Sequence, residues 1–131
     1  MSNAHTVQRI YEAFGRGDVP AILAELDERI EWETQAPVPD VPWLQPRRGK
    51  EKIVGFFEAI APLTITRFEP HTVFDGGSKV FVLIAFEATS HGRHYAFPNN
   101  GHLWAFNSVG KVIRFDHVTD TAQMIRLARG D

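Results

Sequence analysis

Two histidines in the last third of the chain, His102 and His117, have the residue type and spacing that acid–base chemistry needs. The segments 100–106 and 111–119 alternate with a period of two, which predicts two strands that each have one buried face. A turn at 107–110 joins them into a hairpin. Each histidine falls on the face of its strand that also carries aromatic residues. We therefore expect both imidazoles to point into one pocket.

The predicted hairpin register sets the separation of the two rings. Closing the strands at the turn places His102 opposite Phe115 and His117 opposite Asn100, so the histidines become diagonal neighbours with Cβ atoms roughly 7–8 Å apart. An apolar surround disfavours the charged imidazolium and leaves neutral rings that can accept a proton at neutral pH. One hypothesis makes His117 the acid or base and His102 the second donor. The alternative is two buried polar residues satisfied by Asn100, by each other or by water.

Aromatic residues are abundant for so short a chain: ten Phe, three Trp and two Tyr among 131 residues. Such side chains fill a core, and they also line pockets for small apolar or aromatic ligands. The residues expected to contact a ligand are Phe14, Trp32, Trp43, Phe57, Asn100, Trp104 and Phe115. For any one of the aromatic residues, a plain core position is the alternative. Trp43 lies in a proline-rich segment, where it is expected either to cover the pocket mouth or to contact a second subunit.

Composition excludes several classes of function. The net charge is −2 and no basic cluster extends beyond Arg47 and Arg48, so nothing favours nucleic-acid binding. Cysteine is absent, which removes disulfides, thiolate nucleophiles and cysteine-based zinc sites. No apolar run reaches the length of a membrane span and no basic-then-apolar leader opens the chain, so a cytoplasmic protein without membrane contact is expected. The length favours one domain over 1–131.

Other titratable residues offer weaker signals. His91 and His94 flank a predicted hairpin turn, and a metal site would need three or four converging ligands, so no metal is expected there. Glu87 lies in the middle of a predicted strand. It either faces outward or points inward, where it would be the carboxylate that orients a histidine.

The order of the predicted elements indicates an α+β fold. Helices come first, then an antiparallel meander, and residues 35–48 form a loop with four prolines. The short strand 30–34 is expected at an edge of the sheet. Helices are predicted from Val7 to about 15–17 and at 19–26, 50–61 and 121–129, and the meander strands at 64–74, 79–90, 94–107 and 111–119.

Several strings in this order resemble the SnoaL-like branch of the nuclear transport factor 2-like superfamily, which includes ketosteroid isomerases, polyketide cyclases and limonene epoxide hydrolases. They are Ile10-Tyr11-Glu12-Ala13-Phe14-Gly15-Arg16-Gly17-Asp18, Ile30-Glu31-Trp32, Arg48-Gly49, Gly110-Lys111-Val112-Ile113-Arg114-Phe115 and Asp120-Thr121-Ala122. The resemblance covers nearly the whole chain. It implies a curved antiparallel sheet that forms a cone around the N-terminal helices, with an internal apolar cavity.

This chain has different residues at the positions where these relatives carry their catalytic residues. Where a ketosteroid isomerase has a Tyr and two Asp, the matching positions hold Ile10, His102 and Trp32. The Asp that an epoxide hydrolase needs on the last strand matches His117, and no Arg–Asp pair occurs in 83–89. A SnoaL-type cyclase uses an acidic residue near the position of His117, a role that histidine can fill chemically.

The resemblance also implies homodimers formed through the convex face of the sheet. Arg114 and Asp116 alternate with the inward positions of the last strand and are expected on that face, with Leu103, Ala105, Val112 and Val118. We expect a small-molecule-binding domain whose cavity supports cofactor-free isomerase, cyclase or hydratase chemistry on a small apolar carbonyl compound. The alternative is a non-catalytic ligand-binding or dimeric accessory protein.

Overall fold

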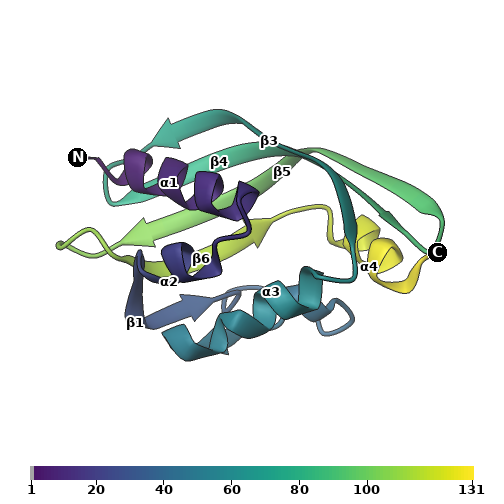
Figure 1. Cartoon of the computed structure of the whole chain (residues 1–131), viewed down its shortest axis with the longest axis horizontal. Coiled ribbons are helices and arrows are strands. Elements are labelled where there is room, and N and C mark those ends of the chain that lie inside the picture. Colours follow the sequence, from purple (N-terminus) through teal and green to yellow (C-terminus); the bar gives the residue numbers. More distant parts are fainter. Residues whose placement is uncertain (1) are drawn as a thin grey trace.

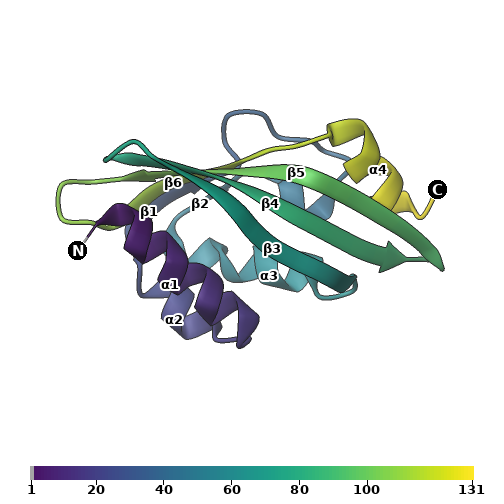
Figure 2. The same cartoon turned by 90° about the horizontal axis from the view of Figure 1, so that it is seen from above.

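The computed structural model describes residues 2–131, in which a curved six-stranded sheet carries helices on one face (Figures 1 and 2). The elements in chain order are α1 (Asn3–Gly15), α2 (Val19–Leu23), β1 (Leu26–Trp32), η1 (Pro42–Leu44), β2 (Arg47–Arg48), η2 (Lys50–Lys52), α3 (Val54–Ile60), β3 (Thr64–Asp75), β4 (Lys79–Ser90), β5 (Arg93–Phe106), β6 (Val112–Val118) and α4 (Thr121–Arg129). The predicted α+β class is confirmed. The sheet is curved but does not close.

The sheet runs in the order β2-β1-β6-β5-β4-β3. The meander from β3 to β6 is antiparallel, as predicted. The expected place of β1 at the sheet edge is wrong, because β1 pairs in parallel with β6 and the two-residue β2 forms that edge. β1 also begins at Leu26, inside the stretch predicted to be helical. There Leu26 and Ile30 are 2% and 0% exposed, so burial against the sheet outweighs the local helical pattern.

The hairpin register differs from the prediction by two residues. His102 lies directly opposite His117, and Trp104 lies opposite Phe115. A shift of two residues keeps every side chain on its face, whereas a shift of one would have reversed them all. The two histidines therefore share the inner face and are closer than the predicted diagonal arrangement.

Half of this difference arises at the turn, where Phe106 pairs with Val112, and a bulge next to it adds the other residue. Ala105 pairs with Arg114 and Phe106 with Val112, which leaves Ile113 as the extra residue of β6. Ile113 is 38% exposed and Val112 is fully buried, so the faces predicted for these two side chains are reversed. Beyond the bulge the alternation follows the prediction.

Helices α2 and α4 begin where a capping side chain accepts a hydrogen bond from a backbone N–H group. Asp18 accepts from Ala21 N at the start of α2, and Asp120 accepts from Gln123 N at the start of α4. Helices α1, α2 and α3 lie on one face of the sheet, while α4 and the segment after β1 lie toward its other side (Figure 2). No helix among the described residues is long and apolar enough to span a membrane. The core lies between α1–α3 and the inner face of the sheet, and Trp43 of η1 and Met124 and Leu127 of α4 are part of it.

Candidate functional site

A cavity of about 70 Å³ lies between the inner face of the sheet and the helices. Its wall is almost entirely apolar and carries every side chain that the sequence nominated as a site residue. Those side chains are Phe14, Trp32, Trp43, Phe57, Asn100, His102, Trp104, Phe115 and His117. The rest of the wall consists of Ile10, Tyr11, Ile22, Phe56, Ile60, Leu63, Ile65, Phe68, Phe86 and Met124. The structure thus brings the nominated residues to one cavity, and their contact with a ligand stays a prediction.

His102 and His117 form the polar part of this wall. Their ring centroids are 4.7 Å apart, with the ring planes nearly perpendicular. Phe115 packs against both, at 5.0 Å from His102 and 4.9 Å from His117. Two imidazoles in contact within an aromatic wall provide two nitrogen-centred groups for one small ligand.

A buried carboxylate holds His117. Glu33 is 3% exposed, and its Oε1 accepts one hydrogen bond from the backbone N–H of His117 at 2.9 Å and a second from ring Nδ1. The Nδ1–H proton therefore belongs to this bond. The other ring nitrogen, Nε2, has no hydrogen bond among the described residues and is the one that can accept a proton from a ligand.

The end of β1 explains how Glu33 reaches this position. The last pair of the parallel ladder is Trp32 with Phe115, and Glu33 N donates to Phe115 O at 2.9 Å. Glu33 then adopts a φ of 59°, a left-handed conformation that costs a non-glycine residue about 1 kcal/mol or more. The chain leaves the ladder here. The carboxylate takes the place of the strand carbonyl that would otherwise accept the N–H of His117.

Tyr11 determines the tautomer of His102. Its hydroxyl lies 3.0 Å from Trp104 Nε1, which can only donate, and 2.9 Å from His102 Nδ1. Burial raises the pKa of the Tyr11 hydroxyl, so it keeps its single proton and donates it to Nδ1. His102 therefore carries its own proton on Nε2.

Burial, and secondarily repulsion from the His117 ring when that ring is protonated, lowers the pKa of His102 well below its ordinary value. The ring is then neutral at pH 7, with an N–H donor at Nε2. The structure thus pairs a hydrogen-bond donor, His102, with a proton acceptor, His117, on the same stretch of wall.

Two further polar atoms at the cavity lack partners. Asn100 Oδ1 and Trp32 Nε1 are buried and make no hydrogen bond among the described residues. Buried polar atoms are rarely left unpaired in native proteins, so such atoms beside a cavity point to a ligand or water. Trp43, by contrast, has a partner: its Nε1 donates to Met124 Sδ at 3.4 Å. It is 5% exposed, so it forms part of the cavity wall and offers almost no surface to a second subunit.

Some residues named from the sequence lie elsewhere. Asp116 lies on the outer face as predicted, although it is only 6% exposed, whereas the expectation that Val112 lies on that face is wrong because the bulge turns it into the core. Glu87 pairs with Arg67 and His94 on the surface and takes no part in the cavity. No group of three or more potential metal ligands occurs among residues 2–131.

The sequence interpretation missed two residues of the site, Glu33 and Tyr11. Strict alternation gives Glu33 the face opposite to Trp32, and only its left-handed backbone conformation turns the carboxylate inward. Tyr11 did carry a usable signal. It belongs to the buried stripe of the first helix, where a tyrosine hydroxyl needs a partner. The family resemblance matches Ile10 to a catalytic tyrosine, whereas the hydroxyl that contacts His102 belongs to the next residue, Tyr11.

Comparisons with known proteins agree with this architecture. The model of a SnoaL-like domain matches residues 7–116. No curated protein matches the chain. An NTF2-like protein of unknown function from Burkholderia pseudomallei K96243 is 29% identical, with 98% of both chains covered and a TM-score of 0.85.

Two more distant structures share the fold. TerC, co-crystallized with polyporic acid, is 22% identical with a TM-score of 0.80, and the match covers 97% of this chain and 98% of TerC. A protein from Xanthomonas campestris pv. campestris that is called a polyketide cyclase is 21% identical with a TM-score of 0.70, over 96% of each chain. At these identities the likeness shows the fold alone.

Proposed function

Because the chain belongs to the SnoaL-like family, we propose that its cavity binds a small apolar carbonyl compound and catalyses acid–base chemistry beside the carbonyl group. The observation that carries the proposal is the pair formed by Glu33 and His117. The carboxylate orients the imidazole and leaves its Nε2 free next to the N–H donor of His102. A base and a hydrogen-bond donor side by side are the two groups that enolisation requires.

The proposed step moves one proton. His117 Nε2 takes a proton from the carbon next to the carbonyl, and the electron pair of the broken C–H bond shifts to the carbonyl oxygen to form an enolate. His102 Nε2–H donates a hydrogen bond to that oxygen as its charge develops. Glu33 stabilises the imidazolium that forms on His117.

The fate of the enolate decides the overall reaction. Where the substrate has a C=C bond next to the deprotonated carbon, a dienolate forms, and return of the proton from His117 to its far carbon gives an isomer. Attack of the enolate carbon on a second carbonyl of the same molecule gives a ring, and the proton on His117 then neutralises the new alkoxide. Both routes need only groups present on the cavity wall. The neutral state of His102 supports its role, because a cationic neighbour would disfavour proton transfer to His117.

Deuterium exchange tests the proposal without knowledge of the natural substrate. Hexan-2-one in D₂O is incubated with the protein, and NMR follows loss of the protons at C1 and C3. The wild type is expected to accelerate exchange over buffer, and His117→Ala to lower the rate roughly 10²–10⁴-fold. His94→Ala, which changes an exposed histidine, is the matched control. Exchange no faster than buffer, or undiminished in His117→Ala, would contradict the catalytic role and favour a non-catalytic binding protein.

The proposal includes a homodimer formed through the outer face of the sheet. Phe74 and Val118 expose 53% and 54% of their surface there, and Leu103 lies on the same face. Exposed apolar side chains gathered on one face are typical of an interface between subunits. Light scattering at micromolar concentration should give the mass of a dimer, and Val118→Glu should give a monomer. A wild-type monomer would contradict this part of the proposal.

A further inference from the structure

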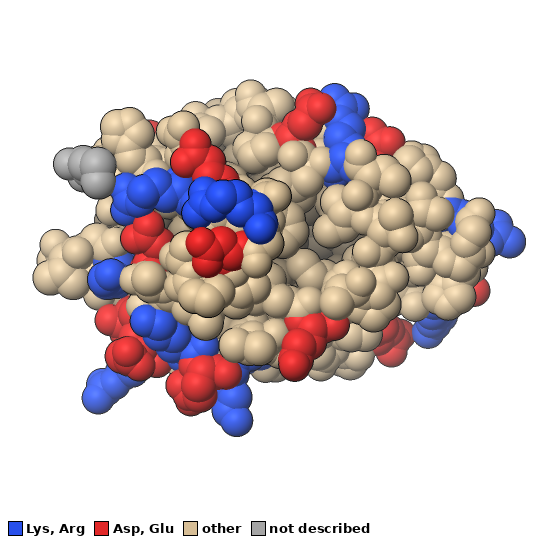
Figure 3. All heavy atoms as spheres, in the orientation of Figure 1, with Lys and Arg blue, Asp and Glu red and all other residues tan. Residues whose placement is uncertain are grey.

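A second hollow opens on the surface next to the cavity. It has a volume of about 290 Å³ and is lined only by apolar residues and glycine. These are Phe14, Gly17, Val19, Ile22, Phe57, Ile60, Ala61, Leu63 and Ile65. Figure 3 shows the surface hollowed near the middle of that view, between the C-terminal ends of α1 and α3. A hollow without any polar side chain is a poor site for water and a good one for a hydrocarbon.

The hollow and the cavity are adjacent. They share six lining residues, namely Phe14, Ile22, Phe57, Ile60, Leu63 and Ile65. Phe14 and Phe57 come from α1 and α3, and their ring centroids are 6.5 Å apart. Only side chains therefore separate the two spaces, and a ligand that moves those rings slightly can occupy both.

Polarity divides the combined space into two ends. Asn100, His102 and His117 belong to the cavity and none of them lines the hollow. The cavity holds about 70 Å³, the liquid volume of about two water molecules. A cavity of about 150 Å³ is known to hold a benzene ring. A ligand whose carbonyl reaches the histidines must therefore extend toward the hollow unless it is very small.

We propose that the ligand is an amphiphile, with a small carbonyl head at His102 and His117 and an apolar chain that lies in the hollow between α1, α2 and α3. This inference rests on the proposed function for the identity of the head group. It adds the tail, the direction in which the tail leaves the cavity, and the surface that selects its length. The affinity of the protein is set by the apolar area that the chain buries in the hollow.

The homologous series from butan-2-one to nonan-2-one tests the inference. All three tryptophans of the chain, Trp32, Trp43 and Trp104, line the cavity, so intrinsic fluorescence reports entry of the ketone head. Each added methylene is expected to lower Kd about fourfold until the chain fills the hollow. A Kd that stays constant across the series would overturn the inference.

Variants at the rim of the hollow locate the tail. Ala61 and Val19 line the hollow and not the cavity, and Ala61 is exposed. Ala61→Asp should reduce the ratio of the Kd of butan-2-one to that of nonan-2-one at least tenfold, because a charge there opposes burial of the chain. Val19→Asp, at the start of α2, is a second variant with the same expectation. Ala122→Asp, on an exposed position of α4, is the matched control and should keep the ratio of the wild type.

The outcomes separate the tail from the catalysis. His117→Ala should lose deuterium exchange and keep the dependence of Kd on chain length. Exchange without any chain-length dependence would refute the tail and leave the proposed function standing. Chain-length dependence that Ala61→Asp and Val19→Asp remove, in a protein without exchange, would support the tail and refute the catalysis.

Discussion

The molecule contains two histidine–glutamate pairs that differ in burial. The side chains of His117 and Glu33 are 7% and 3% exposed, whereas those of His94 and Glu87 are 54% and 27% exposed. Both pairs have a short contact between a ring nitrogen and a carboxylate oxygen. The outer pair lies in solvent, where salt and water screen its attraction.

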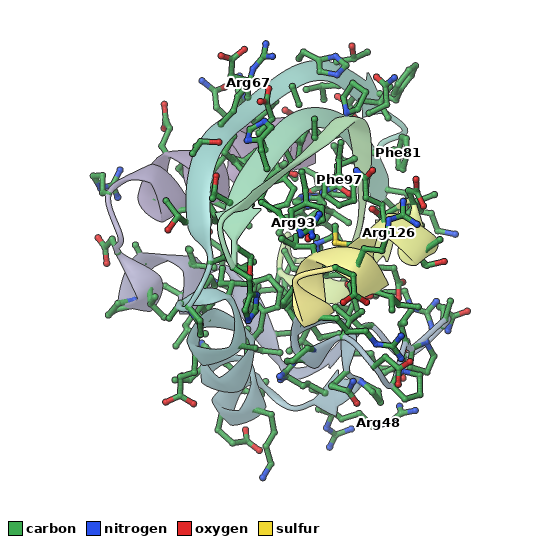
Figure 4. All side chains as sticks on the ribbon, turned by 90° about the vertical axis from the view of Figure 1, so that its right-hand side faces the viewer. Arg48, Arg67, Phe81, Arg93, Phe97 and Arg126 are labelled. Atoms are coloured by element: carbon green, nitrogen blue, oxygen red, sulfur yellow. The ribbon has the colours of Figure 1, made fainter. Side chains whose placement is uncertain are left out.

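The surroundings of the pairs give them different roles. Glu87 also binds Arg67 at 3.2 Å, and these two partners lower the pKa of its carboxyl, Arg67 more than His94. In Figure 4, Arg67 projects away from the core, whereas Phe97 lies within the curve of the sheet. The inner carboxylate instead binds one residue, His117, through two nitrogens. Burial thus turns a loose surface contact into a fixed orientation of one imidazole.

The largest difference between the two pairs is expected when the charge of each glutamate is removed in turn. Glu33→Gln keeps an oxygen that can accept both N–H groups of His117, but it removes the negative charge that stabilises the imidazolium formed during proton transfer. We expect deuterium exchange to fall about 10²-fold and the free energy of unfolding to fall about 2 kcal/mol. Glu87→Gln should change neither measurement detectably. Equal effects of the two substitutions on NMR exchange and urea unfolding would remove the distinction between the pairs.

Tyr11 extends the inner cluster and offers the next test. Tyr11→Phe leaves His102 Nδ1 and Trp104 Nε1 without their shared partner. We expect a loss of about 2 kcal/mol in the free energy of unfolding, measured by urea denaturation. Tyr95→Phe, which removes a hydroxyl bonded to the backbone oxygen of Asp131, is the control and should cost less. A larger loss in the control would show that the inner hydroxyl is not a structural anchor.

His102 should also make the free energy of unfolding depend on pH. The pKa of His102 is well below its ordinary value in the folded state, so the unfolded chain binds a proton that the folded chain does not. Stability is therefore lost as the pH falls below about 6.5, by at most about 1.4 kcal/mol per pH unit. His102→Leu should flatten unfolding curves measured between about pH 5 and pH 7. His94→Ala should not, and an unchanged slope in His102→Leu would contradict the buried neutral state.

A second buried carboxyl, that of Asp116, gives the smallest expected effect. Asp116 is 6% exposed, neither carboxylate oxygen has a hydrogen bond of normal geometry, and Arg114 Nε lies 3.8 Å away. Burial, and then the nearby charge of Glu33, raises the pKa of Asp116, so its ionised form destabilises the fold at neutral pH. Asp116→Asn should raise the free energy of unfolding at pH 7 by about 1 kcal/mol. The gain should vanish as the pH falls below about 4, where the unfolded carboxyl is protonated too. A loss of stability in urea unfolding at pH 7 would mean that the carboxylate is favourably paired.

Much of the fold and part of the site follow from the sequence, because they depend on local periodicity. The alternation of 100–106 placed His102 and Trp104 on the inner face, and the stripe of the first helix placed Phe14 against them. The start of α4 was predictable from the capping side chain of Asp120, which acts within four residues of its own position. Those features depend on neighbouring residues in the sequence and not on which strands pair in the sheet.

The tertiary structure decided the rest, because it depends on which strand lies next to which. The turn and the bulge at Ile113 together set the register that puts His102 opposite His117, and the hairpin sequence alone favoured a pairing two residues away. The parallel pairing of β1 with β6 ends at Trp32, and the left-handed turn at Glu33 then delivers a carboxylate to an N–H left without a strand partner. Alternation determines which face a side chain occupies, whereas pairing across the sheet and the point where a ladder ends determine which side chain it meets.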